Sequence, residues 1–214
     1  MIKVECFSCN MLAENCFVVS DETKECVIID CGAYRSEERN KIIKYIQEEK
    51  LKPVHLLSTH GHLDHHLGDN TIFETYGLKP EAHEGDRTWM ENPQNAASTI
   101  FGITLNYDLP ETNYCIKNNT IIKFGTHSLK TIATPGHSNG SVCYYCEKEH
   151  LLFTGDTLFK RSIGRTDFPG GSMFQMVSSL RLLAQLPDET IIYPGHGDSS
   201  TIGYEVAHNL YLDR

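Results

Sequence analysis

Four apolar runs, each followed at once by a turn with glycine and a histidine or aspartate, constrain this chain more than any other feature. They read VHLLSTHGH, LKTIATPGH, LLFTGD and TIIYPGHG. Glycine lets the backbone turn sharply at the end of such a run. In α/β proteins the loops at the carboxyl ends of strands converge at one sheet edge, where ligands collect. Four ends of this kind predict one shared centre.

The rest of the pattern alternates strands with helices. A helix is predicted from about residue 36 to residue 50, with Ser36 as its N-cap. A clearer one is predicted from residue 172 to residue 186, with Ser172 as its N-cap and Pro187 as its stop. Further strand-like runs read NCFVVS, ECVIID, TIIKF and SVCYYCE. The fold class is therefore predicted to be α/β with mixed sheets.

Length and charge limit the class of protein. With 214 residues, of which 40% are hydrophobic, the chain is predicted to form one domain, residues 1–214. Its net charge of −9 argues against a nucleic-acid or anionic-membrane partner, which would call for a basic surface. We see no signal peptide and no membrane span, so we expect a cytoplasmic protein with a small-molecule substrate. The oligomeric state is left open.

Eight cysteines, with two CxxC pairs at Cys6/Cys9 and Cys143/Cys146, raise the alternatives of disulfides or a zinc site. The run SVCYYCE predicts a strand, however, and positions three apart on a strand point to opposite faces. Buried, reduced thiols that pack as small apolar groups are the better interpretation.

The first of the four turns is the most crowded. The motif HxHxDH holds three histidines and an aspartate, and three more donors stand at the other strand ends. Imidazole nitrogen and carboxylate oxygen suit Zn²⁺ or Fe²⁺, and a site without thiolate is unlike a closed structural zinc site. Seven donors exceed what one catalytic metal needs, but they fit two metals that share a ligand. The predicted metal ligands are His60, His62, Asp64, His65, His137, Asp156 and His196.

These motifs, in this order, resemble the metallo-β-lactamase superfamily. Within it, the chain most resembles the glyoxalase II (hydroxyacylglutathione hydrolase)-like branch, from NCFVV and VIIDCG through to YPGHG. The resemblance implies an αββα sandwich, in which two mixed β-sheets lie face to face, helices cover them, and metals sit along one edge.

The resemblance also implies how the ligands divide. A water between two cations loses its proton near neutral pH, which gives a nucleophilic hydroxide. Asp64 is hypothesised to shuttle a proton there, as a catalytic residue. The implied activity is dinuclear zinc hydrolysis of a thioester or related ester. By the family pattern His60, His62 and His137 hold the first metal, Asp64, His65 and His196 hold the second, and Asp156 bridges them.

Other residues beside these motifs have two interpretations each. Asp30, at the end of CVIID, could orient a metal-binding histidine or serve only in a turn. Lys160, Arg161 and Arg165 could hold an anionic substrate, such as the carboxylates of a glutathione-like carrier. The alternative is a solvated loop in which Arg165 pairs with Asp167.

The stretch from residue 84 to residue 118 holds the only tryptophan, Trp89, among turn-forming residues. It is interpreted either as a lid or pocket wall, or as a surface helix and loop with ordinary aromatic anchors.

The specific activity has alternatives. Glyoxalase II enzymes carry a C-terminal extension that helps to bind glutathione, and only 18 residues follow His196 here. The segment GRTDF resembles persulfide dioxygenases, in which one iron would be held by His60, His137 and Asp156. A catalytically silent metal-binding module is a third possibility, against which the intact ligand set speaks. β-Lactamase activity is disfavoured, because Asp156 stands where some of those enzymes carry cysteine.

Overall fold

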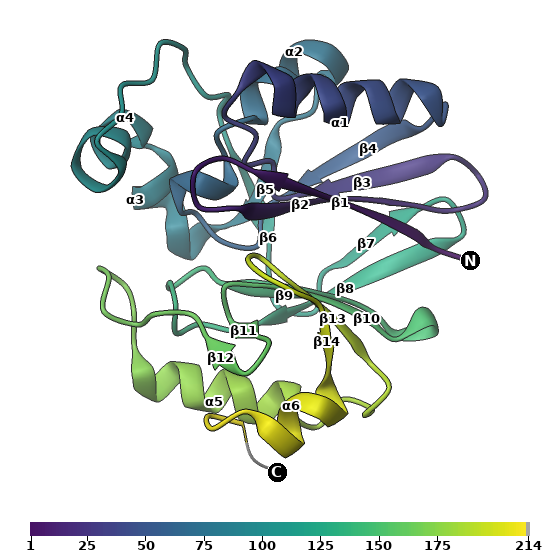
Figure 1. Cartoon of the computed structure of the whole chain (residues 1–214), viewed down its shortest axis with the longest axis vertical. Coiled ribbons are helices and arrows are strands. Elements are labelled where there is room, and N and C mark those ends of the chain that lie inside the picture. The colour runs from purple at the N-terminus through teal and green to yellow at the C-terminus, as the bar shows by residue number, and fades with distance from the viewer. Residues whose placement is uncertain (213–214) are drawn as a thin grey trace.

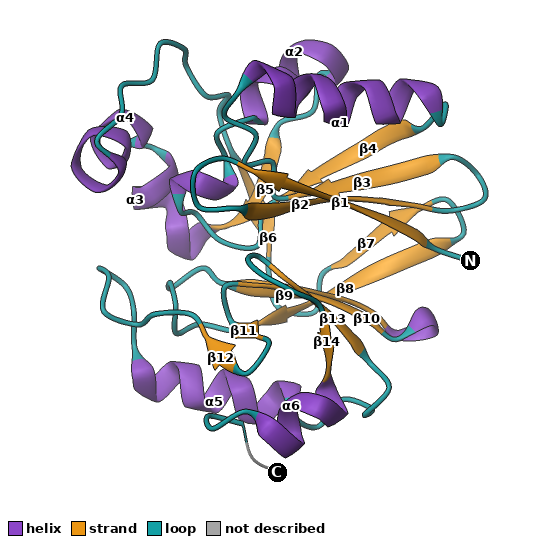
Figure 2. Cartoon of the chain, viewed as in Figure 1, coloured by secondary structure: helices purple, strands orange, loops and turns teal. Residues whose placement is uncertain are grey.

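Two six-stranded sheets pack face to face in the computed structural model, which describes residues 1–212, and helices cover their outer faces (Figure 1). This is the predicted αββα sandwich. Figure 2 shows the layers from the side, with α1 and α2 above the first sheet and α5 and α6 below the second.

The first sheet has the order β1-β2-β3-β4-β5-β6. Its first three strands are antiparallel, and β3 to β6 run parallel. Parallel neighbours need a crossover, and α1 (Ser36–Glu48) and α2 (Asp69–Tyr76) supply two of them. The strands are β1 (Lys3–Cys9), β2 (Glu14–Ser20), β3 (Glu25–Ile29), β4 (Lys52–Leu57), β5 (Pro80–His83) and β6 (Asn113–Ile116).

The second sheet has the order β14-β13-β10-β9-β8-β7, and β10 and β13 are its parallel pair. Helix α5 (Met173–Leu183) lies on the crossover between them, and α6 (Ile202–His208) follows the edge strand. The strands are β7 (Ile121–Phe124), β8 (His127–Ala133), β9 (Val142–Cys146), β10 (Leu151–Gly155), β13 (Ile191–Pro194) and β14 (Ser200–Thr201), with a separate pair β11 (Leu158–Phe159) and β12 (Ser162–Ile163).

Six of the eight cysteines are buried free thiols, as the sequence predicts, and two are not buried. All eight are free, and on β9 Cys143 packs with the apolar side chains under α5 whereas Cys146 packs between the two sheets. Cys6 and Cys115 are exposed, and the other six are buried. The thiols of the second CxxC pair therefore point apart, and this pair is part of the core.

The two predicted helices exist, with one correction. In α5 the Ser172 hydroxyl accepts a hydrogen bond from the Gln175 N–H at 3.3 Å, as predicted for an N-cap. In α1 the cap position is Arg35 and not Ser36. There the Glu38 carboxylate accepts the Arg35 N–H at 3.0 Å, so an acidic side chain inside the first turn does the capping. Both helices end a few residues earlier than predicted.

Short helical turns fill the region between α2 and β6, on the left of Figure 2. They are α3 (Arg87–Met90), α4 (Pro93–Ala96) and a π-helical turn, Ala97–Phe101. None of the described helices is both long enough and apolar enough to cross a membrane.

Candidate metal centre

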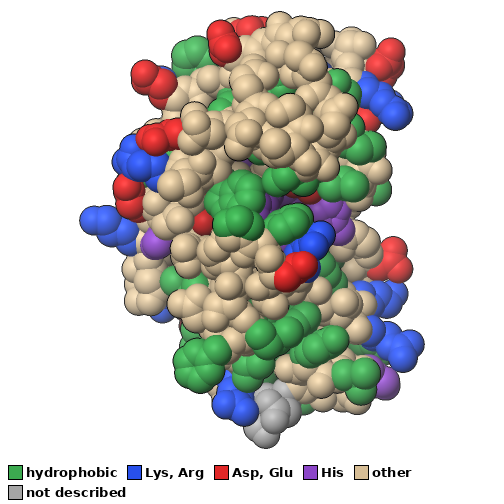
Figure 3. Space-filling view, turned by 90° about the vertical axis from the view of Figure 1, so that its left-hand side faces the viewer, with side chains coloured by type: hydrophobic (Ala, Val, Ile, Leu, Met, Phe, Trp, Pro, Cys, Tyr) green, Lys and Arg blue, Asp and Glu red, His purple; other side chains and the backbone are tan. Residues whose placement is uncertain are grey.

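The four strand ends that the sequence singles out meet at one edge of the sandwich. β4, β8, β10 and β13 each end directly before a turn that carries predicted ligands. Figure 3 views the molecule from the left side of Figure 1 and shows histidine side chains recessed among hydrophobic ones. The structure thus brings together all seven predicted ligands, which come from both sheets.

Two of the glycines in these turns are required by the backbone. Gly155, directly before Asp156, has a φ of 48°, and a Cβ there would lie 2.3 Å from the Thr59 hydroxyl oxygen. Gly136, directly before His137, has a φ of 148°, and a Cβ would lie 2.5 Å from the Met176 backbone. Any side chain at either position would strain the turn and move the donor that follows it.

His60, His62 and His137 form the first group of donors, whose candidate ligand atoms all lie within 4.8 Å of one another. The Nδ1 atom of His62 is 2.8 Å from Nε2 of His137. Two imidazole lone pairs this close repel each other unless a proton or a cation lies beside them.

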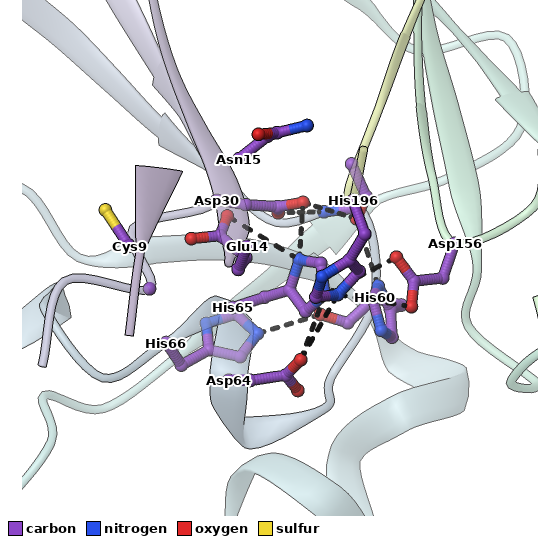
Figure 4. A network of polar contacts seen from close by, with 12 residues as sticks. Cys9, Glu14, Asn15, Asp30, His60, Asp64, His65, His66, Asp156 and His196 are labelled. Atoms are coloured by element: carbon purple, nitrogen blue, oxygen red, sulfur yellow. Dashed lines mark hydrogen bonds and ion pairs between the residues drawn. The ribbon is translucent and has the colours of Figure 1, made fainter. Parts of the chain in front are cut away.

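Asp64, His65 and His196 form the second group, with ligand atoms within the same 4.8 Å limit. An Asp64 carboxylate oxygen lies 3.3 Å from Nε2 of His196 and 3.6 Å from Nε2 of His65 (Figure 4). His65 and Asp64 lie within one short 3₁₀ turn, Leu63–His65, and His196 reaches them from the end of β13.

Asp156 lies between the two groups. Its Oδ2 atom is 3.6 Å from Nε2 of His137 in the first group and 3.6 Å from Nε2 of His196 in the second. Its Oδ1 atom is 3.5 Å from Nε2 of His65. This is the position that a carboxylate shared by two metals would occupy.

Hydrogen bonds behind the histidines turn their Nε2 atoms toward the centre. Asp30 accepts the Nδ1–H of His65 at 3.0 Å and also the Thr59 hydroxyl at 2.6 Å. Because the Thr59 hydroxyl donates to Asp30, its oxygen accepts from Nδ1–H of His60 at 3.0 Å. Asp30 has a φ of 51°, an uncommon conformation for a residue other than glycine. Its carboxylate therefore orients ligands of both groups.

Backbone carbonyls orient two further histidines in the same way. Nδ1–H of His137 donates to the Arg165 carbonyl at 2.7 Å, and Nδ1–H of His196 donates to the Leu12 carbonyl at 3.1 Å. With Nδ1 protonated, each ring presents the lone pair of Nε2 to the centre, which is the tautomer that a metal needs.

Several buried atoms of the cluster have no hydrogen-bond partner among the described residues. They include Nε2 of His60, Nε2 of His65 and Oδ1 of Asp156. Buried polar atoms are nearly always paired, because leaving them unpaired is costly. A divalent cation in contact with these atoms would satisfy them, so the residues fit a metal centre with nitrogen and oxygen ligands.

The protonation states of the histidines are also compatible with metal binding. Burial lowers the pKa of His60 well below its usual value and that of His62 to about 3, so both rings are neutral and can bind a metal. Burial would also lower the pKa of His65, but the carboxylates of Asp64, Asp156 and Asp30 outweigh it and raise this pKa to about 10. A metal bound by His65 would replace that proton.

Sequence reasoning missed Asp86, which ties the two ligand-bearing loops together. Its buried carboxylate accepts the Gly61 N–H at 2.8 Å, the Gly140 N–H at 2.7 Å and the Ser138 hydroxyl at 2.6 Å. Gly61 separates the first two histidines of the motif, and Ser138 follows His137 directly. Asp86 comes soon after β5, so the strand-end rule could have found it had this short strand been recognised.

A second unpredicted residue is Glu14, which is fully buried behind the cluster (Figure 4). Neither of its carboxyl oxygens has a hydrogen-bond partner among the described residues, and Oε1 lies 3.8 Å from Nδ1 of His65. Burial, above all, raises the pKa of Glu14 well above its usual range, so the group is neutral.

The three predicted substrate-binding cations do not lie together. Arg165 lines the cavity in front of the metal donors, and its guanidinium makes two hydrogen bonds to Asp167, at 2.7 and 2.8 Å. Lys160 is not among the lining residues and pairs with Asp198 at 3.2 Å. Arg161 also lies outside the lining, with an exposed side chain.

The residues from 84 to 118 do form part of the cavity wall. The cavity has a volume of about 380 Å³, and Trp89 and Phe101 line it together with donors of both groups. The pocket-wall interpretation of this stretch therefore holds for these two aromatic residues.

Curated relatives match almost the whole chain. A hydroxyacylglutathione hydrolase, GloC, of Haemophilus influenzae is 32% identical over 214 residues, which cover 99% of both chains. A probable metallo-hydrolase, YqgX, of Bacillus subtilis is 32% identical over 92% of this chain and 90% of that one.

Solved structures share the fold over similar lengths. BLEG-1, described as a B3 metallo-β-lactamase, has a TM-score of 0.88 at 34% identity and covers 99% of both chains. TTHA1623 in a di-iron-bound form has a TM-score of 0.87 at 31% identity, over 98% of this chain and all of that one. ETHE1 from Myxococcus xanthus has a TM-score of 0.77 at 27% identity, over 97% and 83%.

The family model of the metallo-β-lactamase superfamily matches residues 10–196, a span that holds all seven candidate ligands. Together with the two packed sheets and the donor groups at their edge, this match shows that the chain belongs to the metallo-β-lactamase superfamily.

Proposed function

We propose that this protein is a dinuclear zinc hydrolase of the glyoxalase II-like branch that cleaves a thioester or a related ester. The observation that carries the proposal is Asp156, which lies between two groups of three donors and has a buried oxygen with no hydrogen-bond partner among the described residues. The similarity to a hydroxyacylglutathione hydrolase over the full chain supports the branch. Most members of the superfamily are metal-dependent hydrolases.

The proposed ligand assignment follows the two donor groups. Two bound cations would polarise the substrate carbonyl and lower the pKa of an attacking water. The protein contributes the geometry, because the hydrogen bonds of Asp30 and of the two carbonyls hold the rings before any metal arrives. The assignment is His60, His62 and His137 for one metal, Asp64, His65 and His196 for the other, and Asp156 for both.

Asp64 is proposed to accept a proton as well as to bind metal. Its side chain is buried but lines the cavity in which the proposed substrate would lie. Burial would raise its pKa, but His65 and His196 outweigh burial and hold that pKa below its usual value. An ionised carboxylate of low pKa is a weak base, so this role requires a water that is itself acidic.

Metal content and turnover together test the proposal. Protein expressed without added metal and purified anaerobically is analysed by elemental mass spectrometry, and thioester hydrolysis is followed by thiol release. The proposal expects about two zinc ions per chain and hydrolysis that is lost on chelation and restored by zinc. Fully loaded protein that cleaves no thioester or ester would refute the proposed activity.

A mononuclear iron persulfide dioxygenase is the second candidate. Two observations favour it: the resemblance of the segment GRTDF to such enzymes and the structural likeness to ETHE1. About one iron per chain with little zinc, and oxygen uptake with a persulfide, would replace the hydrolase proposal. A module that binds metal but turns over no substrate is the third.

His62 separates the first two candidates. In the hydrolase it is a metal ligand, so His62→Ala should lower the metal content and reduce thioester hydrolysis at least about a hundredfold. In the iron enzyme it is not a ligand, and the loss should be milder. His208→Ala, on an exposed histidine of α6, is the matched control. Near-normal hydrolysis and metal content in His62→Ala would refute the assignment of the first metal.

A further inference from the structure

The wall of the metal-facing cavity indicates which part of a substrate it fits. We propose that the substrate is a thioester or ester with an apolar acyl group, a medium-length alkyl chain or an aromatic ring, which lies against this wall. The inference rests on the proposed hydrolase and goes beyond it, because small polar hydroxyacyl groups would leave the same wall exposed to water.

Aromatic rings flank the metal donors on both sides of the cavity. The Trp89 ring lies edge-on to His62 with centroids 4.7 Å apart, and the Phe168 ring lies edge-on to His62 at 5.5 Å. On the other side, the Phe159 ring lies 6.2 Å from that of His196. A carbonyl placed at the metal donors therefore has its substituent beside aromatic carbon.

Aliphatic side chains continue this wall from the floor to the mouth. Leu63 and Ala96 are buried beside the donors, whereas Leu12 and Ile100 at the cavity are 48% and 41% exposed. Exposed apolar side chains gain free energy when a ligand removes them from water. The volume of about 380 Å³ is within the range for small-molecule sites, roughly 300–1,000 Å³.

Charge in the cavity is confined to the metal donors and one ion pair. Among the described residues that line it, Arg165 is the one side chain with a fixed positive charge. Its guanidinium is engaged by Asp167 and lies 3.9 Å from the centre of the Phe168 ring. An anionic substituent would meet a guanidinium whose charge is already paired with Asp167, whereas an apolar one needs no charged partner.

A series of acyl groups on one neutral thiol tests the inference. Acetyl, butanoyl, hexanoyl and phenylacetyl thioesters of N-acetylcysteamine are compared by kcat/KM with zinc-loaded protein. Each buried methylene should raise kcat/KM about fourfold until the cavity is full. Lactoylglutathione, which has a small polar acyl group and an anionic carrier, is the contrasting substrate and should be the poorer one.

Binding to the same wall is also measured without turnover, by the fluorescence of Trp89. Trp89 is the only tryptophan and lines this cavity, so a change in its fluorescence reports a ligand bound beside it. The carboxylic acids that hydrolysis would release, acetate through octanoate, are titrated into the metal-loaded protein. Their Kd should fall about fourfold per methylene. This readout is independent of catalysis.

Ile100→Ala and Ile121→Ala form a matched pair of variants. Ile100 lies at the cavity, whereas Ile121 is 52% exposed on β7, outside it. Ile100→Ala should weaken octanoate binding several-fold and leave acetate binding unchanged, and Ile121→Ala should change neither.

The outcomes separate failure of the inference from failure of the proposed function. If lactoylglutathione is cleaved best and chain length changes neither kcat/KM nor Kd, the hydrolase stands and the apolar acyl group is refuted. If no thioester is cleaved but Kd still falls with chain length, the proposed activity fails while the apolar ligand class is supported. A Kd independent of chain length overturns the inference in every case.

Discussion

Two clusters of histidine and carboxylate side chains join the two sheets, and they differ in how their hydrogen bonds are used. One is the metal centre. The other lies between the end of β2 and the turn before β8, where Asp21, Glu22 and His127 also come within metal-binding distance of one another (Figure 1). There both ring nitrogens of His127 are bonded, to Asp21 at 2.9 Å and to Glu149 at 3.2 Å.

The difference between the clusters lies in the unused lone pairs. At the metal centre the outer nitrogens of His60 and His65 are bonded, and their inner nitrogens have no hydrogen-bond partner among the described residues. At the second cluster each nitrogen of His127 already has a carboxylate. The number of donors alone does not make a metal site, since donors that bond one another have nothing left for a cation.

Among residues that are not themselves proposed ligands, Asp30 is expected to have the largest effect on metal binding. In Asp30 one carboxylate oxygen accepts from His65 and the Thr59 hydroxyl, and the other accepts the Thr59 N–H, so in Asp30→Asn the amide NH2 must face a donor on one side or the other. Metal affinity should fall about 10-fold to 100-fold. Competition with a chromophoric chelator measures it, and Asp21→Asn is the control. If both substitutions weakened metal binding equally, the two clusters would not differ in metal binding as argued above.

A smaller effect on metal binding is expected from Asp86. Its carboxylate oxygens are already hydrogen-bonded, as the ring nitrogens of His127 are, but it lies beside the metal donors. Replacing Asp86 with asparagine should leave one of its buried N–H donors without an acceptor and cost about 1–3 kcal/mol of unfolding free energy without metal. The first metal should bind about tenfold more weakly, because two of its ligand loops lose their tie. Asp198→Asn, at an exposed carboxylate, controls for charge. Unchanged metal affinity would mean that the loops are held without Asp86.

No effect on metal binding is expected from substitutions in the second cluster. There Asp21 should instead make the free energy of unfolding depend on pH. Burial would raise the pKa of Asp21, but hydrogen bonds from Thr23, His127 and Thr126 outweigh burial and hold it below its usual value. A carboxyl with a lowered folded-state pKa stabilises the fold above about pH 4, its unfolded pKa, and this contribution is lost as the pH falls through the folded value.

Urea unfolding of metal-free protein checks this contribution. At pH 7, Asp21→Ala should lower the free energy of unfolding by about 1–3 kcal/mol. The difference in unfolding free energy between this variant and the unaltered protein should become smaller as the pH falls below about 4. A gap that stays constant down to pH 2 would show that packing, and not the charge of Asp21, makes the difference.

The resemblance to the superfamily implied the sandwich, whereas the ligand-bearing strand ends were predicted from signals that are local. An apolar run followed by glycine and histidine is visible within about ten residues, as at VHLLSTHGH. The short strands β5 and β6 were not predicted, because four residues such as PEAH show no clear alternation. The predicted N-cap of α1 was wrong by one residue, because Ser36 already belongs to the helix and the Glu38 carboxylate accepts the N–H of Arg35 before it.

The pattern by itself determined which side chains gather at the centre: strand ends converge, and the donors are contiguous with them. It could not reveal the tie from Asp86, the buried carboxyl of Glu14 or the apolar wall around Trp89 and Ile100. These depend on segments far apart in the chain that meet only when the sheets pack, such as Gly61, Asp86 and Gly140. Which lone pairs stay unused is decided by the same packing, because the folded chain alone sets which nitrogen of each histidine meets an acceptor.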